Sequence, residues 1–363
     1  MHLQRLAVAL ASAVVLAVAI TACGSDSDTG SETSGSTGST SSASTAEGPF
    51  KIGFVEPIGG QPWRELALAT MENLASQDPY KDEVELEIVR TQNNDPAQQV
   101  AAMRNLIAKG VDMLLFDPAS PTAADSVIAE ADSRGIPVMA VGQDIPNEAA
   151  FVVSTDWTEA ATIGAEWLVE QLEGEGNDVV VLEGIKGAPI NEEAMPEVLR
   201  ILEEGGENVV ATNTNGWDES VAEKNIASIL QSQDQIDGVY SYLAGGQGIP
   251  NAFANADRPF VPVVGGSGYN GEACTLEKYK GDGLTGILTS GQQAIYAKGL
   301  QQAYDHLTGK EIEQRQLYPP LVVSSEDDLA KVCLKDKPAL FGIGYEFPGL
   351  NLPLDKTLEF FEG

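Results

Sequence analysis

The sequence predicts an α/β protein of two doubly wound lobes, each built on a parallel sheet. Short apolar runs rich in Val, Ile and Leu alternate along the chain with amphipathic helical patterns, which is typical of strands joined by crossover helices. About 315 residues remain from Pro49 to Gly363, enough to fill two hydrophobic cores. The strand–helix units are too numerous for one ordinary sheet, so we expect two similar lobes.

The first series of units opens with an apolar strand at residues 51–55 and a helix over 62–75. After a second strand at 85–89, Asp95-Pro96 combines a favourable N-cap residue with Pro at the first helical position. The helix that follows carries an apolar stripe and ends at Gly110. The remaining expected elements are a strand at 112–116, a helix that begins at Ser120-Pro121, and a strand at 137–141.

The second series begins near Asp156 and repeats the same alternation. A helix is expected through Trp167 and Leu168, and Asp218 is expected to cap a helix that runs through Ile229. The other expected elements are strands at 178–182, 208–212, 238–242, 261–265, 284–288 and 320–323, and helices near 193–204 and at 292–307.

The first 23 residues predict an export signal. Arg5 precedes a nearly unbroken apolar run at 6–20, which rises only about 22 Å as a helix and is short for a ~30 Å hydrocarbon core. The run ends at Thr21-Ala22-Cys23, which resembles the lipobox of bacterial lipoproteins. We therefore interpret residues 1–23 as a lipoprotein signal peptide with a lipidated Cys23. An ordinary secretory signal with an incidental Cys is the alternative.

Residues 24–48 predict a flexible tether. They are almost entirely Ser, Thr, Gly, Asp and Glu, and such a segment buries too little apolar surface to offset its ordering entropy. Its root-mean-square reach is about 28 Å for a Gly/Ser-like coil. The expected localisation is therefore extracytoplasmic, with the globular part anchored to the cell membrane through lipid on Cys23.

The charge balance excludes one class of partner. The chain holds 54 acidic and 21 basic residues, a formal net charge of −33. Such a surface repels nucleic acid and anionic lipid and favours solubility, so no nucleic-acid partner is expected.

The sequence offers little support for a catalytic site or a metal site. His2 belongs to the signal peptide, and His306 lies in a polar helix where a surface position is expected. The sequence has no His/Cys/carboxylate cluster at metal spacing and no G-x-S-x-G motif. Residues 266–271 match G-x-G-x-x-G, but a dinucleotide fold places that motif in its first βα unit. We expect no catalytic residue, no metal and no cofactor.

Two cysteines remain once Cys23 is assigned to lipid. Cys274 and Cys333 would share an oxidising compartment, which favours a disulfide between them. Two free buried thiols are the alternative.

The order of several motifs along the chain indicates a protein family more specifically than any single motif does. The chain contains KIGFVEPIGGQPW, IVRTQNNDPAQQVAAMRNLIAKGVDMLLFDPAS, IPVMAV and VVSTDWTEAATIGAEWL, which resemble the first lobe of type 1 periplasmic binding proteins of the ribose- and galactose-binding kind. The segments VVLEGIKGAPIN, DGVYSYLAGG, VPVVGG and AKGLQQAYDHLTGK resemble the rest of that family. The similarity spans about residues 51–323.

The resemblance implies two α/β lobes joined by a three-crossover hinge, with crossings near Asp156, Ser290 and Leu321. It divides the chain into an N-terminal lobe, a C-terminal lobe and a C-terminal extension. The N-terminal lobe comprises residues 49–156 and 291–320. The C-terminal lobe comprises residues 157–290 and 321–345, and the extension comprises residues 346–363. ABC permease subunits are the implied protein partners, and a monomer is expected.

Members of this family bind ligands between the lobes, at the carboxyl ends of strands. Carried over by position, the resemblance implies ligand contacts from Gln61, Trp63, Arg64, Gln143, Asp144, Asn191, Glu192, Trp217, Ser267 and Ser290. The family's usual Asp-Arg pair after IPVMAV is replaced by Gly142-Gln143, so most charged clamps are lost. Two aromatic platforms, Trp63 and Trp217, are retained. Trp157 and Trp167 are interpreted as packing residues.

These features predict the solute-binding component of an ABC importer, without catalysis, that captures a sugar or polyol. The altered clamps leave a nucleoside, autoinducer or amine as alternative ligands, and a sensor that presents its ligand to a membrane receptor is an alternative role. A lobe-shaped enzyme is disfavoured because no nucleophile–base pair is present. Export, the acidic charge and the missing helix-turn-helix exclude a repressor of the same architecture.

Overall fold

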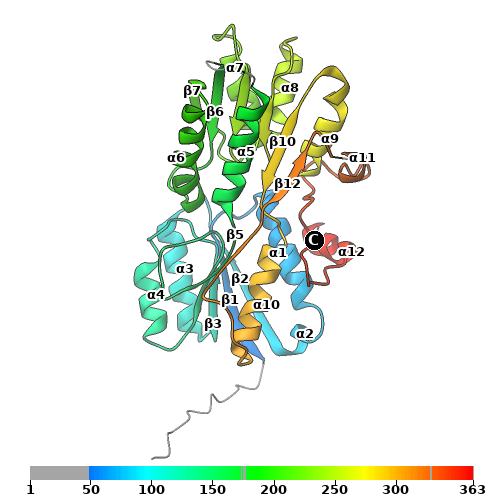
Figure 1. The fold of residues 1–363 in the computed structure, drawn as a ribbon. Coiled ribbons are helices and arrows are strands. Elements are labelled where there is room, and N and C mark those ends of the chain that lie inside the picture. Colours follow the sequence, from blue (N-terminus) through cyan, green and yellow to red (C-terminus); the bar gives the residue numbers. More distant parts are fainter. Residues whose placement is uncertain (1–48, 173, 175–176, 328, 363) are drawn as a thin grey trace, which may run out of the picture. The chain divides into compact units, whose positions relative to one another are not determined.

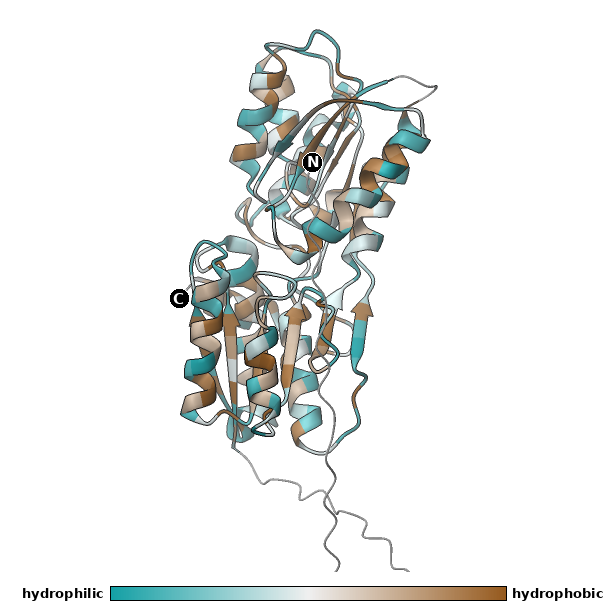
Figure 2. Cartoon of the chain, turned by 90° about the vertical axis from the view of Figure 1, so that its left-hand side faces the viewer, coloured by the Kyte–Doolittle hydropathy of each residue, from teal (hydrophilic) through white to brown (hydrophobic). Residues whose placement is uncertain are grey.

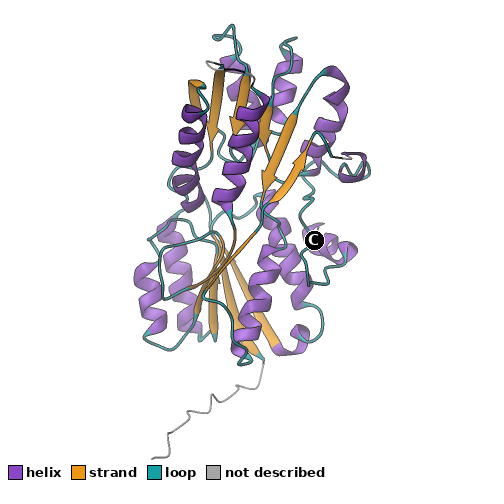
Figure 3. Cartoon of the chain, viewed as in Figure 1, coloured by secondary structure: helices purple, strands orange, loops and turns teal. Residues whose placement is uncertain are grey.

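The computed structural model describes residues 49–172, 174, 177–327 and 329–362, and they form two mainly parallel six-stranded sheets. Helices cover both faces of each sheet (Figures 1 and 3). We call each sheet with its helices a lobe. Signal residues 1–23, including Cys23, and the tether at 24–48 lie outside the described residues.

The first lobe has the strand order β11-β5-β4-β3-β1-β2. Its strands are β1 (Phe50–Glu56), β2 (Val84–Arg90), β3 (Met113–Phe116), β4 (Val138–Gly142), β5 (Phe151–Thr155) and β11 (Arg315–Tyr318). Its helices are α1 (Pro62–Ala75), α2 (Tyr80–Glu83), α3 (Pro96–Lys109), α4 (Asp125–Asp132), α10 (Ile295–Leu307) and α12 (Leu354–Glu362).

The second lobe has the strand order β12-β10-β9-β8-β6-β7. Its strands are β6 (Asp178–Glu183), β7 (Asn208–Thr214), β8 (Gly238–Ser241), β9 (Val263–Gly265), β10 (Gly286–Ser290) and β12 (Leu321–Ser324). Its helices are α5 (Trp157–Gln171), α6 (Pro189–Glu204), α7 (Glu219–Ile229), α8 (Gly248–Asn255), α9 (Asn270–Tyr279), α11 (Leu329–Val332) and a 3₁₀ turn at Lys280–Asp282.

Alternation along the strands divides each lobe into two apolar layers. In β3, Met113 and Leu115 pack against α1 and α10, whereas Leu114 and Phe116 pack against α3 and α4. Successive side chains of a strand point to opposite faces, so a strand buried on both sides is apolar throughout. Figure 2 shows this as hydrophobic strands between helices whose outer faces are hydrophilic.

Local signals set several helix ends as predicted. The Asp95 carboxylate accepts hydrogen bonds from the backbone N–H groups of Ala97 and Gln98, and Gly110 ends α3 with a φ of 77°. Asp218 caps α7 in the same way. Ser120-Pro121 does not begin a helix, however. A turn intervenes, closed by the Asp125 N–H to the Thr122 carbonyl, and α4 begins only at Asp125.

The predicted strand at 320–323 corresponds to β12, and a further strand, β11, precedes it in the other lobe. β11, which sequence analysis missed, pairs parallel with β5 in the first lobe. β12 then pairs antiparallel with β10 in the second lobe, so that sheet is not wholly parallel. The chain thus crosses between lobes at the three expected places: between β5 and α5, between β10 and α10, and between β11 and β12.

A fourth passage follows near the C-terminus. Residues up to Ile343 contact the second lobe, where the Ile343 N–H donates to the Gly268 carbonyl, but Phe347 and Leu352 enter the core of the first lobe. The final helix α12 lies beside α1 (Figure 1), where Asn73 Nδ2 donates to Thr357 Oγ1 at 2.8 Å. We call residues 335–362 the C-terminal strap.

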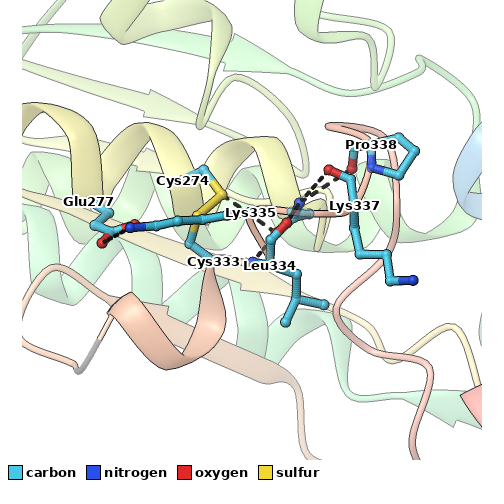
Figure 4. The surroundings of a disulfide bond; sticks show 8 residues. Cys274, Glu277, Cys333, Leu334, Lys335, Lys337 and Pro338 are labelled. Atoms are coloured by element: carbon cyan, nitrogen blue, oxygen red, sulfur yellow. Dashed lines mark hydrogen bonds and ion pairs between the residues drawn. A yellow bond between two sulfur atoms is a disulfide. The ribbon is translucent and has the colours of Figure 1, made fainter.

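A disulfide holds the chain just before this strap. Cys274 on α9 is joined to Cys333, and Lys335 and Glu277 form an ion pair beside the bond (Figure 4). Asn270 at the start of α9 accepts the Leu334 N–H and donates to the Leu334 carbonyl. The disulfide therefore links the chain covalently to the second lobe before the chain passes to the first lobe.

Candidate ligand-binding site

A cavity of about 40 Å³ lies where strands of both sheets end. Loops after β1, β3 and β4 line it from the first lobe, and loops after β6, β7, β8 and β9 line it from the second. Ligand sites in open α/β sheets occur at this edge. The lining residues are Gln61, Trp63, Arg64, Asp117, Gly142, Gln143, Trp157, Ile190, Trp217, Leu243, Ser267, Tyr269 and Ser290.

A buried ionic cluster forms the first-lobe wall. Arg64 Nη1 donates to Glu56 Oε1 at 3.0 Å and also to Asp117 Oδ2. The Tyr296 hydroxyl lies 2.7 Å from Glu56 Oε2 and also within hydrogen-bond distance of Asp117 Oδ2, and its single proton can serve one of the two at a time. Gln143 Nε2 donates to Asp117 Oδ1 and to the Pro118 carbonyl. One guanidinium thus faces two carboxyl groups, all at most 4% exposed.

Burial decides how this cluster titrates. Loss of hydration raises the pKa of Glu56 to about 7, although the charge of Arg64 opposes the rise and Asp117 adds to it. Burial works against the charge on Arg64, but Asp117 and Glu56 raise the pKa of the guanidinium above its ordinary value. Arg64 therefore stays charged, whereas Glu56 changes charge near neutral pH.

Aromatic rings form much of the remaining wall. Trp63 at the start of α1 meets Trp157 at the start of α5, with ring centroids 6.4 Å apart. Because α1 and α5 belong to different lobes, this contact crosses the cavity. Trp157 Nε1 donates to the Gly142 carbonyl at 2.6 Å, so its ring is held at the entry to the hinge. Flat apolar faces such as these suit the C–H side of a sugar ring.

Two bulky cavity residues sit in a backbone conformation that L-residues rarely adopt. Trp217 has a φ of 59° and Leu243 a φ of 57°. Each such residue costs about 1–3 kcal/mol, which the surrounding structure must offset. Asn215 helps to offset the strain at Trp217. Its Oδ1 accepts the Trp217 N–H at 2.8 Å, and its Nδ2 donates to Ser241 Oγ at 2.9 Å.

Close packing fixes the Trp217 ring. The indole lies against Gly184, where an added Cβ would stand 2.1 Å from Trp217 Nε1. Only glycine at position 184 leaves room for this ring.

Two carboxyl groups behind the second-lobe wall hold its loops. Buried Glu272 accepts backbone N–H groups from Ser267 at 3.0 Å and Tyr269 at 2.9 Å. Glu219 accepts those of Gly245 and Gly248 at 2.6 and 2.8 Å. Burial, and then the adjacent Glu219, raise the pKa of Glu272 well above its ordinary value. The glycine-rich loop at 266–271 is thus shaped as a cavity wall.

The comparisons with known proteins agree with this geometry. A family model described as "Periplasmic binding protein domain" matches residues 52–311. The chain belongs to this family. The family consists of solute-binding proteins rather than enzymes, and its members work outside the cytoplasm. The resemblance found in the sequence is therefore confirmed.

Individual relatives of this periplasmic binding protein are distant. The xylitol-binding protein of Mycolicibacterium smegmatis is 26% identical over 71% of the chain and 75% of its own length. A solute-binding protein structure from Thermobispora bispora superimposes with a TM-score of 0.72 at 26% identity, over 80% of this chain and 90% of that one. A Bacillus halodurans solute-binding protein with bound myo-inositol has a TM-score of 0.68 at 21% identity, over 79% and 98%, and shares the fold.

The structure brings seven of the ten predicted contact residues to the cavity of this binding protein. They are Gln61, Trp63, Arg64, Gln143, Trp217, Ser267 and Ser290. The other three do not line it. Asp144 pairs with Arg315, Glu192 accepts the Gly187 N–H at 2.7 Å, and Asn191 Oδ1 accepts the Gly184 N–H at 2.8 Å.

Sequence analysis missed several cavity residues. Asp117 directly follows β3, and this position after a strand was the available signal. Trp157 was interpreted as a packing residue; it does pack in the core, but it also lines the cavity. Tyr269, Ile190 and Leu243 carried no signal that separates them from core residues. His306, expected at the surface, is partly buried against the Phe151 ring.

Among the described residues, no group of three or more His, Cys, Asp or Glu is placed to hold a metal ion. The helices described in 49–362 include none with the length and apolar character needed to span a bilayer.

Proposed function

We propose that this protein is the solute-binding component of an ABC importer and captures a sugar or polyol between its two lobes. The observation that carries the proposal is the cavity itself. It combines the buried Arg64–Asp117 pair with the faces of three tryptophans. Charged partners make stronger hydrogen bonds to hydroxyls than neutral ones, and aromatic faces pack against C–H groups.

The relatives support this ligand class. The proteins that match the chain include xylitol-, ribose- and galactofuranose-binding proteins. Solved structures of similar fold hold myo-inositol and D-allose. We propose that Gln61, Trp63, Arg64, Gln143, Trp217, Ser267 and Ser290 contact the ligand, together with Asp117, Trp157 and Tyr269.

Entry of a ligand requires movement. A cavity of about 40 Å³ holds a few water molecules at most and is smaller than a monosaccharide. We propose that the lobes open and close about the chain crossings, and that the ligand biases this equilibrium toward the closed state.

We also propose the lobe boundaries given by the resemblance: 49–156 with 291–320, 157–290 with 321–345, and 346–363 as an extension. The strand order supports this division, because β11 joins the first sheet and β12 the second. The strap adds a contact of the extension with the first lobe.

The protein is further proposed to be a monomeric lipoprotein, with a signal peptide at 1–23 and lipid on Cys23, that docks onto permease subunits. The lipobox and the polar segment at 24–48 support the anchor. Replacing Cys23 with Ser should leave unprocessed precursor or shed the protein from the membrane fraction. A processed variant that still partitions with membranes would contradict the anchor.

A thermal-shift screen of the mature chain against sugars, polyols and nucleosides tests the ligand class. A ligand at 100 times its Kd adds about 2.7 kcal/mol to the stability. Hits would then be measured by titration calorimetry. Stabilisation by nucleosides alone, or by no member of the panel, would contradict the proposal.

A further inference from the structure

The two lobes line the cavity with walls that differ in charge. The first lobe presents Arg64, Asp117 and Gln143, which are linked to one another by hydrogen bonds and an ion pair. The second lobe presents Ile190, Trp217 and Leu243, which belong to one apolar cluster. Among the described residues of the second lobe, no carboxylate or cationic side chain lines the cavity.

The two serine hydroxyls near this apolar wall already use their protons, whereas the Trp217 indole N–H at the cavity has no partner among the described residues and remains a donor for a ligand oxygen. Ser267 Oγ donates to the Leu243 carbonyl at 2.9 Å, and Ser290 Oγ donates to the Gly291 carbonyl at 3.3 Å. A ligand hydroxyl that faced Ile190 or Leu243 would lose its bonds to water without a replacement. An apolar carbon at the same place would gain contact area instead.

The backbone gives a second, independent observation. The other described residues with positive φ are glycines, Asn93, Asn94 and Asp257, which tolerate this conformation. Trp217 and Leu243 are the two bulky exceptions, and both line the cavity. Glycine or asparagine would fit these two positions without backbone strain. Because the chain carries large apolar side chains there instead, we take those side chains to be required in the cavity wall.

From these observations we infer that the ligand has an apolar edge, a methyl or deoxy carbon, that faces Ile190 and Leu243. Its hydroxyls face Arg64, Asp117 and Gln143. The ligand class is therefore a deoxy sugar or a polyol that lacks a hydroxyl at one end, rather than a fully hydroxylated hexose. This inference rests on the proposed function and narrows it.

The test compares sugars that differ by one hydroxyl. Titration calorimetry on the mature chain would use D-glucose and 6-deoxy-D-glucose, D-galactose and D-fucose, L-mannose and L-rhamnose, and D-ribose and 5-deoxy-D-ribose. In the pairs that bind, the deoxy member should bind at least about tenfold more tightly, a difference of 1.4 kcal/mol. Leu243→Asn should remove or reverse this preference, because asparagine tolerates positive φ and offers an amide to a hydroxyl.

Asp257→Asn is the matched control. It changes another positive-φ residue, which is exposed and does not line the cavity, so the deoxy preference should stay unchanged. If Leu243→Asn does not fold, Leu243→Met and Ile190→Thr carry the same comparison, and only Ile190→Thr should weaken the preference.

The outcomes separate the two proposals. Equal or tighter binding of the hydroxylated members, or an unchanged preference in the folded Leu243→Asn and Ile190→Thr variants, would overturn the inference and leave sugar binding standing. Failure of every sugar, deoxy sugar and polyol to bind would overturn both.

Discussion

Arg64 and Asp117 form an ion pair at the cavity wall although they come from different parts of the first lobe. Arg64 lies in the first turn of α1, and Asp117 follows the last residue of β3. Glu56 at the end of β1 binds the same guanidinium, so one cation serves two buried carboxyl groups. The family's usual Asp-Arg pair is absent after β4, but a pair of the same types stands nearby in a different arrangement.

Loss of Arg64 should destabilise the fold. Arg64→Met leaves Glu56 and Asp117 buried without their cation, and breaking a buried pair in this way costs about 3–5 kcal/mol. Arg200→Met is the control, since Arg200 forms its ion pairs on the exposed surface of α6 and its loss should change little. Urea unfolding measures both. Equal stability of the two variants would contradict this account of the cluster.

The pH dependence of the free energy of unfolding should reflect the titration of the Glu56 carboxyl group. Its pKa is about 7 in the folded protein, against an ordinary value of 4.5, so the folded state holds the proton more tightly than the unfolded chain. The contribution of this bound proton to the free energy of unfolding is fully present below about pH 4.5 and is lost as the pH rises through about 7. The loss amounts to about 3 kcal/mol.

Glu56→Gln removes this titration. The free energy of unfolding of the variant, relative to the parent, should therefore rise between pH 5 and pH 8 in urea titrations. Other acids, Glu272 among them, titrate in both proteins and largely cancel in the difference. A difference that stays constant with pH would show that Glu56 does not titrate in this range.

The aromatic walls should carry a large part of the ligand affinity. Burial of an aromatic ring contributes about 1.5–3 kcal/mol, so Trp63→Ala and Trp217→Ala should each weaken binding at least about tenfold. Trp167→Ala is the control, because Trp167 is a partly buried residue of α5 that does not line the cavity. Titration calorimetry with a ligand from the thermal screen decides. Parent-like affinity in both cavity variants would place the ligand elsewhere.

The disulfide should stabilise the second lobe and the start of the strap. Cys274 and Cys333 are 59 residues apart in sequence, and closing a loop of this size contributes about 4 kcal/mol in the chain-entropy model. The double variant Cys274→Ser/Cys333→Ser should unfold at lower urea concentration than the parent. A reductant should shift the parent to the same midpoint and leave the variant unchanged. Alkylation of two thiols in the native protein would contradict the bond itself.

Much of the fold was predictable because its signals are local. Asp95 and Asp218 cap helices with their own side chains, and the apolar runs of β1, β3 and β6 are buried on both faces. The assignments of β11 and β12 to different sheets depend on pairing with distant strands. Only Pro319 and Pro320 separate β11 from β12, and periodicity does not reveal which sheet each strand joins.

The cavity was predictable only in part for a related reason. Trp63 and Trp217 follow strand ends, so position and residue type both pointed to the site. Asp144 adjoins Gln143, but the two side chains diverge, one to Arg315 and the other to Asp117. Leu243 looks like any core leucine in sequence, and only its backbone conformation distinguishes it.

The C-terminal strap has a consequence for survival outside the cytoplasm, where proteases act on exposed loops. The described chain passes between the lobes four times, so a single cut in any one passage leaves the lobes joined by the other three. A cut between β12 and α11 would not release the strap either, because Cys333 remains bonded to Cys274 on α9. A cut in the second or third passage, both of which lie between Cys274 and Cys333 in sequence, would therefore leave the two fragments joined by the disulfide.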